Sequence, residues 1–282
     1  MGRDALIAIA DGAYYEACAP LFIWAALRAA PESKIIICFR GAVPAKVRLA
    51  VEGLKGADDR VVYAERLGAG LPRDPKTTKM LRWTLSADEF KGATRAWIGD
   101  VDILLAPELI ALHDQHQIHA SKMGLPYSNV LIHDQHGPML SGLHWIDVDR
   151  YLKALAGGMA HASKAIRSGD AQRRWRRDRH LLHHIIESSD VALPGVDCTE
   201  TRSEQAMFRP SDPCFRPHHG LHLRLWDDAA LKKTLWLRSS PAYRSYKRLL
   251  APVLNSPDSG MPSIDHPRLK KHLKNLMLEV SS

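Results

Sequence analysis

The stretch Ala96-Trp97-Ile98-Gly99-Asp100-Val101-Asp102 gives the main indication of the fold. Its first three residues are apolar, as in a short buried strand, and a glycine and two carboxylates follow them directly. A second apolar run, 103–105, comes next, so the carboxylates lie between two buried segments. In open α/β sheets ligands bind outside the carboxyl ends of the strands, and Asp100 and Asp102 are therefore candidate binding residues.

Strand and helix patterns alternate through the residues that precede this stretch. We expect strands at 5–10, 34–39 and 60–64, and helices at 14–30, 44–54 and 76–85. Strands that alternate with helices form a mostly parallel sheet covered by helices on both faces. Asp11 directly follows the first of these strands, so we expect it at the same edge of the sheet as Asp100.

The second half of the chain is less regular. The segment 113–145 is rich in His, Gly and Pro without a strong helix pattern, and 193–217 is loop-like. Helices are expected at 148–166, 172–186 and 267–280. After residue 230 the chain becomes basic and aromatic. We therefore expect one domain at 1–230, followed by a basic helical extension at 231–282.

The composition is that of an ordinary globular protein with an excess of positive charge. The 282 residues are 45% hydrophobic and 25% charged, with Lys+Arg 39, Asp+Glu 31 and a formal net charge of +8. A basic balance suits an anionic partner, such as a nucleotide diphosphate, an acidic polymer or a phospholipid surface. No apolar run approaches the ~18 residues of a membrane span, and residues 1–10 lack the pattern of a signal peptide, so we expect a cytoplasmic location.

Two carboxylates one residue apart at the end of a strand can share a hard divalent cation. Mg²⁺ and Mn²⁺ prefer oxygen ligands, and the phosphate oxygens of a substrate complete their coordination. The pattern occurs a second time at Asp147-Val148-Asp149. That copy precedes a helical pattern, and acidic residues are favoured at a helix N-terminus. We therefore assign the metal site to Asp100 and Asp102.

Polar side chains late in the chain provide two further candidates. Three histidines flank Gly220 and can offer an imidazole to a metal or a donor to a phosphate, unless they lie in a surface loop: His218, His219 and His222. Glu204 and Gln205 follow a long loop. They either face a substrate or occupy the first turn of a helix capped by Ser203 or Thr201.

Two patterns in the middle of the chain are weaker indications of function. His113, His116 and His119 are three and six residues apart, which allows zinc binding on one face of a helix, but the pattern H-E-x-x-H is absent from this segment. The segment 173–179 carries arginines around Trp175 and is typical of a solvated helix face. It matches no recognised nucleic-acid-binding module, so nucleic acid is not an expected partner.

Taken in order, these motifs resemble the bacterial glycosyltransferases of the GT-A fold that assemble lipopolysaccharide and capsule. The resemblance covers residues 5–225 and rests on six segments: Ala10-Asp11 with Tyr14-Tyr15, Lys79-Met80-Leu81-Arg82-Trp83, Trp97-Ile98-Gly99-Asp100-Val101-Asp102, Tyr127-Ser128-Asn129-Val130 with Ser141-Gly142-Leu143-His144-Trp145, Glu204-Gln205, and His218-His219-Gly220. It implies a Rossmann-like, mostly parallel sheet flanked by helices, with a basic C-terminal helical appendage.

The resemblance also implies roles for individual residues. The residues that would contact a nucleotide-sugar donor are Ala10, Asp11, Tyr14, Lys79, Arg82, Asp100, Ser141, Gly142 and His144. Asp100, Asp102 and His219 would hold Mn²⁺ or Mg²⁺, with His218 or His222 as substitutes for His219. Glu204 and Gln205 would face the reacting sugar as catalytic residues.

The activity implied by the resemblance is transfer of a sugar from a nucleotide-diphosphate donor to a saccharide or lipid-linked acceptor. The enzyme would be cytoplasmic, with peripheral contact to the anionic inner face of the membrane as an option. Gly99 and the lack of a Lys-Pro-Trp ending after the late histidines depart from the family pattern, which leaves retention or inversion open. Two alternatives stay open: a non-catalytic sugar- or nucleotide-binding protein of the same fold, and a zinc hydrolase built on the histidines.

Overall fold

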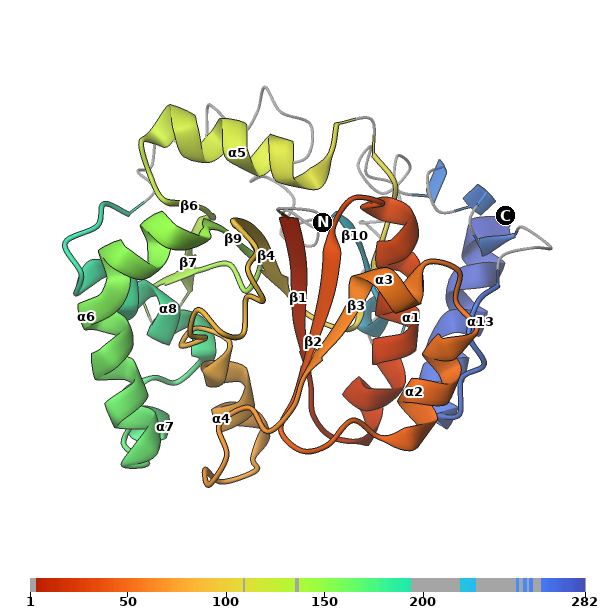
Figure 1. Ribbon diagram of the computed structural model, residues 1–282, viewed down its shortest axis with the longest axis horizontal. Coiled ribbons are helices and arrows are strands. Elements are labelled where there is room, and N and C mark those ends of the chain that lie inside the picture. The colour runs from red at the N-terminus through yellow and green to blue at the C-terminus, as the bar shows by residue number, and fades with distance from the viewer. Residues whose placement is uncertain are drawn as a thin grey trace.

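The computed structural model describes residues 4–108, 110–134, 137–193, 219–226, 247–248, 251–252, 254–255 and 260–281 (Figure 1). The strands in these residues are β1 (Asp4–Ala10), β2 (Lys34–Phe39), β3 (Val61–Ala64), β4 (Arg95–Gly99), β5 (Ile103–Leu105), β6 (Tyr127–Ser128), β7 (Leu131–Asp134), β8 (Gly137–Leu140), β9 (His144–Asp147) and β10 (Gly220–His222). The helices are α1 (Ala13–Ala29), α2 (Ala45–Glu52), α3 (Ala57–Arg60), α4 (Pro75–Leu81), α5 (Leu112–Met123), α6 (Val148–Arg167), α7 (Ala171–Arg174), α8 (Asp178–Glu187), the 3-10 turn η1 (Leu223–Trp226) and α13 (Pro267–Ser281).

The central sheet has six strands in the order β3-β2-β1-β4-β9-β6. β1 pairs in parallel with β2 and with β4, and β2 pairs in parallel with β3. β9 runs antiparallel to both β4 and β6. β1 and β2 are apolar and largely buried along their length, as expected of parallel strands that are covered on both faces. The expected α/β fold with a mostly parallel sheet is therefore confirmed.

Helices cover both faces of this sheet (Figure 1). Alternate residues of β1 belong to two separate cores, because successive side chains of a strand point to opposite faces. Leu6 and Ala8 pack in the core that includes α1, whereas Ala5 and Ile7 pack in the core that includes α4, α6 and α8. With both faces covered in this way, the ends of the strands are where a ligand can approach the sheet.

Two expected elements differ from the observed ones. The segment 113–145 begins with helix α5, which we did not expect because three of its six buried residues are histidines. The helix expected at 172–186 is divided into α7 and α8. The division occurs at Trp175, which adopts an extended conformation and packs its side chain into the core.

A two-stranded ribbon brings the late segment 219–226 to the strand that follows the two carboxylates. β10 pairs antiparallel with β5, with Gly220 opposite Leu105 and His222 opposite Ile103. Beyond the pairing, the Leu223 amide donates a hydrogen bond of 2.8 Å to the Asp102 carbonyl oxygen. A Cβ atom at position 220 would lie 1.8 Å from the backbone oxygen of Leu104, so this close approach requires glycine.

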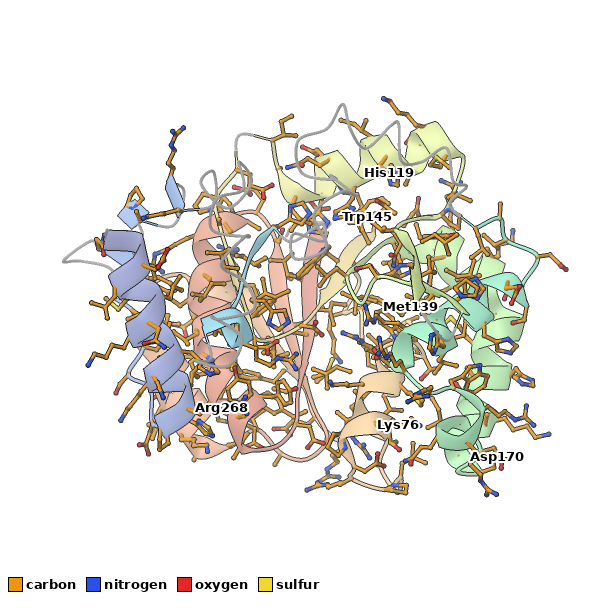
Figure 2. All side chains as sticks on the ribbon, turned by 180° about the vertical axis from the view of Figure 1, so that it is seen from behind. Lys76, His119, Met139, Trp145, Asp170 and Arg268 are labelled. Carbon is orange, nitrogen blue, oxygen red and sulfur yellow. The ribbon has the colours of Figure 1, made fainter. Side chains whose placement is uncertain are left out.

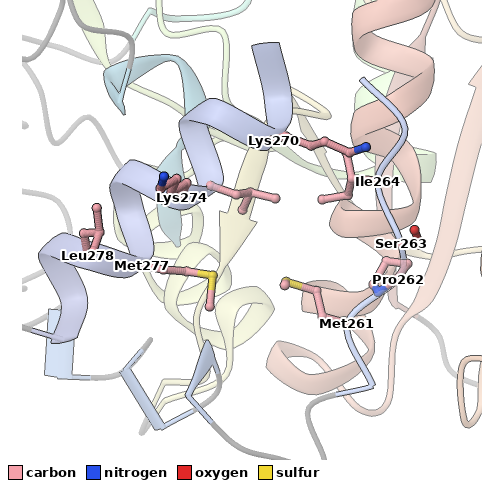
Figure 3. A pocket seen from close by; sticks show the side chains of 9 residues that line it. Met261, Pro262, Ser263, Ile264, Lys270, Lys274, Met277 and Leu278 are labelled. Carbon is pink, nitrogen blue, oxygen red and sulfur yellow. The ribbon is translucent and has the colours of Figure 1, made fainter. Parts of the chain in front are cut away.

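The basic C-terminal helix of the expected appendage is observed as α13, which lies beside α1 (Figure 1). Leu269, Leu273 and Leu276 are buried and belong to the same core as α1. A cavity of ≈ 630 Å³ lies between α13 and residues 261–264, and Figure 3 shows Met261 and Met277 at its walls. The domain division at residue 230 stays a prediction. Among the described residues, no helix combines the length and the apolar composition needed to cross a membrane.

Candidate functional site

β4 ends at Gly99 and places the two carboxylates at the end of the sheet. The Asp100 side chain is partly exposed, whereas Asp102 is fully buried, with 0% of its surface exposed. A Cβ atom at position 99 would lie 2.2 Å from the indole ring of Trp97. Glycine at this position therefore leaves room for the Trp97 ring.

His222 joins the two aspartates in a group spaced to hold a metal ion. Its Nε2 atom lies 3.5 Å from Asp100 Oδ2 and 3.5 Å from Asp102 Oδ1. Asp102 Oδ1 is buried and accepts no hydrogen bond from the described residues. We call Asp100, Asp102 and His222 the carboxylate site. Within the described part of the chain it is the one such group of acidic, histidine or cysteine side chains, and its carboxylate oxygens and imidazole suit Mn²⁺.

In each aspartate of the carboxylate site, the oxygen that does not face His222 is bound by an arginine. Arg82 Nη1 donates to Asp100 Oδ1 at 2.6 Å, and the same guanidinium also pairs with Asp178 at the start of α8. Arg224 Nε donates to Asp102 Oδ2 at 2.6 Å. Each carboxylate therefore has one oxygen engaged by a guanidinium and the other oxygen facing His222.

These charges determine the ionisation of Asp100. Burial alone would raise the pKa of Asp100, but the charge of Arg82 and the contact with His222 hold it well below its usual range. Burial also opposes the charge of Arg82, yet Asp178 and Asp100 raise the pKa of its guanidinium. Asp100 is therefore ionised at neutral pH and can bind a cation.

A cavity of ≈ 200 Å³ opens beside Asp100. Four cationic side chains line it, together with the carboxylates of Asp11 and Asp100: Arg73, Lys79, Arg82 and Arg224. Arg82 and Arg224 are already paired with Asp100, Asp178 and Asp102, so Arg73 and Lys79 supply the additional positive charge that favours an anionic ligand such as a phosphate. Tyr15 adds an aromatic wall, with its ring centre 5.9 Å from the Arg224 guanidinium.

Asp11 is held at the cavity by a relay of hydrogen bonds. Thr78 Oγ1 donates to Asp11 Oδ2 at 2.7 Å, and Arg40 Nη1 donates to Thr78 Oγ1 at 3.1 Å. Arg40 is buried and also donates to carbonyl oxygens within residues 67–72. Asp74 caps α4 by accepting from the amides of its first turn, which fixes the helix that presents Thr78.

The residues expected to contact the donor fall into two groups. Four of them line the cavity: Asp11, Lys79, Arg82 and Asp100. Ala10 is buried within β1 and does not line it. Tyr14 faces α13, where its hydroxyl lies 3.4 Å from His272 Nδ1, and the neighbouring Tyr15 takes the position beside the cavity.

The segment 141–144 lies against Arg82 instead of lining the cavity. A Cβ atom at Gly142 would be 3.0 Å from Arg82 Nη2, and the Ser141 amide donates to Asn129 Oδ1 at 2.9 Å. His144 is fully buried, with Nδ1 2.7 Å from Asn129 Nδ2. Burial and the charge of Arg82 lower the pKa of His144 to about 3, so it is neutral. Of these residues, Gly142 packs against the Arg82 guanidinium, and the other two are held by Asn129.

A second group of histidines is buried at the end of the β5–β10 ribbon that is remote from Asp100 and Asp102. We call it the histidine cluster, and its members are His113, His116, His119 and His219. His219 Nε2 lies 2.9 Å from His116 Nε2, and His219 Nδ1 lies 3.0 Å from Glu108 Oε2. The Nδ1 atoms of His116 and His119 are each 2.8 Å from Ser128 Oγ. Figure 2 shows His119 at one end of the molecule, away from Lys76 on α4.

The structure thus brings His222 to the aspartates, in place of His219, which was the first choice from the sequence. His219 precedes β10 and lies next to Ala106, whose amide donates to its carbonyl oxygen at 2.7 Å. Three residues of extended chain, about 10 Å, separate it from His222 and turn its side chain to the opposite side. His218 lies outside the described residues. No member of the histidine cluster belongs to a metal-holding group within the described part of the chain, so the zinc alternative gains no support.

Sequence reasoning missed Arg40, Asp178 and Arg224. Arg224 had only a weak signal, because it follows His222 by two residues but lies in the 3-10 turn η1 and not on the strand. Arg40 and Asp178 had none, since their partners are distant in the sequence. The expected catalytic pair Glu204 and Gln205 lies outside the described residues.

No family model and no curated protein sequence matches the chain. Among solved structures, it is similar to the galactosyltransferase LgtC in complex with donor and acceptor sugar analogs, at 14% identity and a TM-score of 0.45, over 95% of this chain and 99% of that one. An active-site mutant of LgtC gives 14% identity and a TM-score of 0.49 over the same shares. The glycosyltransferase GlyE of Streptococcus pneumoniae TIGR4 gives 12% and 0.45, over 88% of this chain and 63% of that one. Likenesses of this degree leave the activity to be argued from the side chains of the site.

Proposed function

We propose that this chain is a glycosyltransferase that binds a nucleotide-diphosphate sugar in the cationic cavity and Mn²⁺ or Mg²⁺ at the carboxylate site. The observation that carries the proposal is Asp102 Oδ1, a buried carboxylate oxygen that accepts no hydrogen bond from the described residues and faces His222 Nε2 at 3.5 Å. Burying such an oxygen is costly unless a hydrogen-bond donor, a water molecule or a cation satisfies it, and a cation fits here because a second carboxylate and an imidazole face the same space. The cavity next to it offers four cationic side chains for a diphosphate.

The side chains of the cavity suit a reaction in which negative charge develops on a leaving diphosphate. When bound, the divalent cation supplies Lewis-acid stabilisation of that charge. Arg82 is already held by Asp178 and Asp100, so it can bind a phosphate oxygen without reorienting. Lys79 and Arg73 add positive charge along the cavity wall. Asp11, fixed by Thr78, can accept a hydrogen bond from the nucleoside part of the donor.

The remaining roles come from the resemblance. Glu204 and Gln205 would face the reacting sugar, and the acceptor would be a saccharide or a lipid-linked saccharide. Peripheral contact with an anionic membrane also stays a prediction that binding to anionic vesicles can test. The apolar face of α13 is buried against α1, so such contact would depend on Lys270, Lys271 and Lys274, of which Lys270 is paired with Asp265 at 3.8 Å.

A non-catalytic protein that binds the same nucleotide sugar is the second candidate, because the cavity alone accounts for binding. Turnover separates the two candidates, since transferases commonly hydrolyse their donor slowly when no acceptor is present. Release of sugar from a panel of nucleotide-diphosphate sugars, measured with and without Mn²⁺, would support a transferase. Saturable binding without any release would support the binding protein.

The variant Asp102→Asn tests the proposed metal site. We expect it to lower Mn²⁺-dependent donor hydrolysis by about 100-fold or more, because the charge that binds the cation is lost while the shape of the side chain is kept. Circular dichroism checks that the variant is folded. The matched control is Asp149→Asn in the second Asp-x-Asp sequence, at the start of α6, which should retain full activity. Full activity in Asp102→Asn, together with indifference to a chelator, would refute a metal-dependent transferase.

A further inference from the structure

Arg224 connects the deepest carboxylate of the site to the cavity. Its Nε atom donates to Asp102 Oδ2 at 2.6 Å, although Asp102 itself is fully buried. The Arg224 side chain as a whole is 40% exposed and lines the cavity together with Arg82 and Lys79. The backbone beside it is fixed, because the Leu223 amide donates to the Asp102 carbonyl oxygen at 2.8 Å. The guanidinium can therefore move while the residue that carries it stays in place.

A divalent cation at the carboxylate site would compete with this guanidinium. The cation would bind between Asp100 Oδ2, Asp102 Oδ1 and His222 Nε2, whose contacts of 3.5 Å define the space. Asp102 Oδ2, on the same carboxylate, already carries the Arg224 ion pair. Two positive charges a few ångströms apart on one carboxylate repel each other, even under strong screening. Arg82 does not meet this conflict in the same way, because Asp178 holds its guanidinium from a second side.

We propose that Arg224 is an exchangeable cation, which pairs with Asp102 in the absence of a ligand and turns into the cavity to hold a phosphate when a divalent cation binds Asp102. This inference rests on the proposed function and adds to it a coupling between cation binding and phosphate binding. The cation and the phosphate ligand both favour the state in which Arg224 has left Asp102. Each therefore raises the affinity for the other, and the two effects are equal because the linkage is reciprocal. The Arg224 side chain is 40% exposed and lines the cavity beside the aromatic ring of Tyr15, and the open cavity provides the space for this movement.

The variant Arg224→Gln separates this role from simple support of the site, because the two affinities should change in opposite directions. Without the competing guanidinium, Mn²⁺ alone should bind about tenfold more tightly, as estimated from two like charges a few ångströms apart in a well-screened site. Inorganic pyrophosphate, titrated at saturating and equal free Mn²⁺, should bind about tenfold more weakly, because one charge-assisted contact is lost. The amide of glutamine can still donate to Asp102 Oδ2, which keeps the buried carboxylate hydrogen-bonded.

Titration calorimetry of both probes on the full-length protein gives these affinities. Arg48→Gln is the matched control, since Arg48 pairs with Glu65 at 2.8 Å on the surface and does not line the cavity, and it should change neither value. If Arg224→Gln melts well below the unaltered protein, Arg224→Met replaces it. Methionine keeps an unbranched side chain and removes the positive charge, so it should still give tighter Mn²⁺ binding and weaker pyrophosphate binding.

A parallel loss of both affinities in the variant that folds, or no change in either, would overturn the exchange. Such a result leaves the proposed function intact as long as the unaltered protein binds Mn²⁺ and Asp102→Asn does not. If the unaltered protein binds no Mn²⁺, both the metal site of the proposed function and the exchange are refuted.

Discussion

The carboxylate site and the histidine cluster are joined by one short ribbon, yet their charges are arranged differently. In the carboxylate site the ionised groups are paired with arginines and lie beside a cationic cavity. In the histidine cluster each imidazole is at most 2% exposed and is hydrogen-bonded to neutral or acidic partners. Residue types that could bind a metal occur in both regions. The carboxylate site is a candidate ligand site because it lies beside a cavity and its charges are paired with arginines. The histidine cluster has neither feature among the described residues and is a polar part of the core.

The largest expected difference between the two regions is in pH dependence. Burial, and then the positive charge of neighbouring groups, lower the pKa of His116 well below its usual range, while burial lowers that of His113 to about 4 despite nearby Asp4. Below about pH 6.5 the unfolded chain binds protons at these histidines and the folded protein does not, so stability falls as pH falls. Each histidine should contribute about 1.4 kcal/mol per pH unit until its folded pKa is reached.

The variant His113→Gln measures this contribution, because glutamine keeps an acceptor for the Trp145 indole N–H, which now donates to His113 Nδ1 at 3.1 Å. Urea unfolding at about pH 7 and about pH 5 should show a smaller loss of stability in the variant than in the unaltered protein. His161→Gln, which replaces an exposed histidine on α6, should leave the loss unchanged. Equal losses in all three proteins would mean that His113 is not held neutral by the fold.

A second pair of variants tests which histidine belongs to which region. His222→Gln should lower Mn²⁺ affinity by at least about tenfold, because an imidazole facing both carboxylates is lost. His219→Gln should leave Mn²⁺ affinity nearly unchanged and lower stability by about 1–3 kcal/mol, since buried His116 and Glu108 lose a partner. Calorimetric Mn²⁺ titration and urea unfolding of both variants give the two quantities. The reverse pattern would restore His219 as the metal ligand.

The smallest expected effect concerns the second Asp-x-Asp sequence, which the structure places at a helix start. Asp147 caps α6 by accepting a hydrogen bond of 3.3 Å from the Arg150 amide. Asp147→Ala should therefore lower the free energy of unfolding by about 1 kcal/mol and leave Mn²⁺ affinity unchanged. A loss of Mn²⁺ binding in this variant would move the metal site away from Asp100 and Asp102.

The fold could be predicted wherever the packing pattern is local. The strands β1 and β2 and the helix α1 are continuous apolar segments, so their sequence alone indicates buried elements. Helix α5 could not be recognised in this way, because half of its buried residues are histidines. Their partners, such as Ser128 and Glu108, are supplied by other segments of the chain, and only the folded structure shows that these imidazoles find hydrogen-bond partners inside the protein.

The same contrast between local patterns and contacts of distant segments applies to the candidate site. Asp100 and Asp102 were found because a local pattern, an apolar strand followed by two carboxylates, predicts their position at the sheet edge. The choice among the late histidines could not be made, because it depends on the pairing of β10 with β5, more than a hundred residues earlier. The arginine partners of the aspartates are equally non-local, and no single segment of the sequence indicates them.

Gly220 fixes the register in which β10 pairs with β5. Its missing Cβ is what allows the crossing with Leu104, where a side-chain carbon would come within 1.8 Å of a backbone oxygen. If β10 slid by one residue in either direction, His219 or Leu221 would have to occupy that crossing, and every side chain of the strand would turn to the other face. The two histidines therefore cannot exchange places by strand slippage. The different positions of the two histidines are therefore set by a residue that belongs neither to the carboxylate site nor to the histidine cluster.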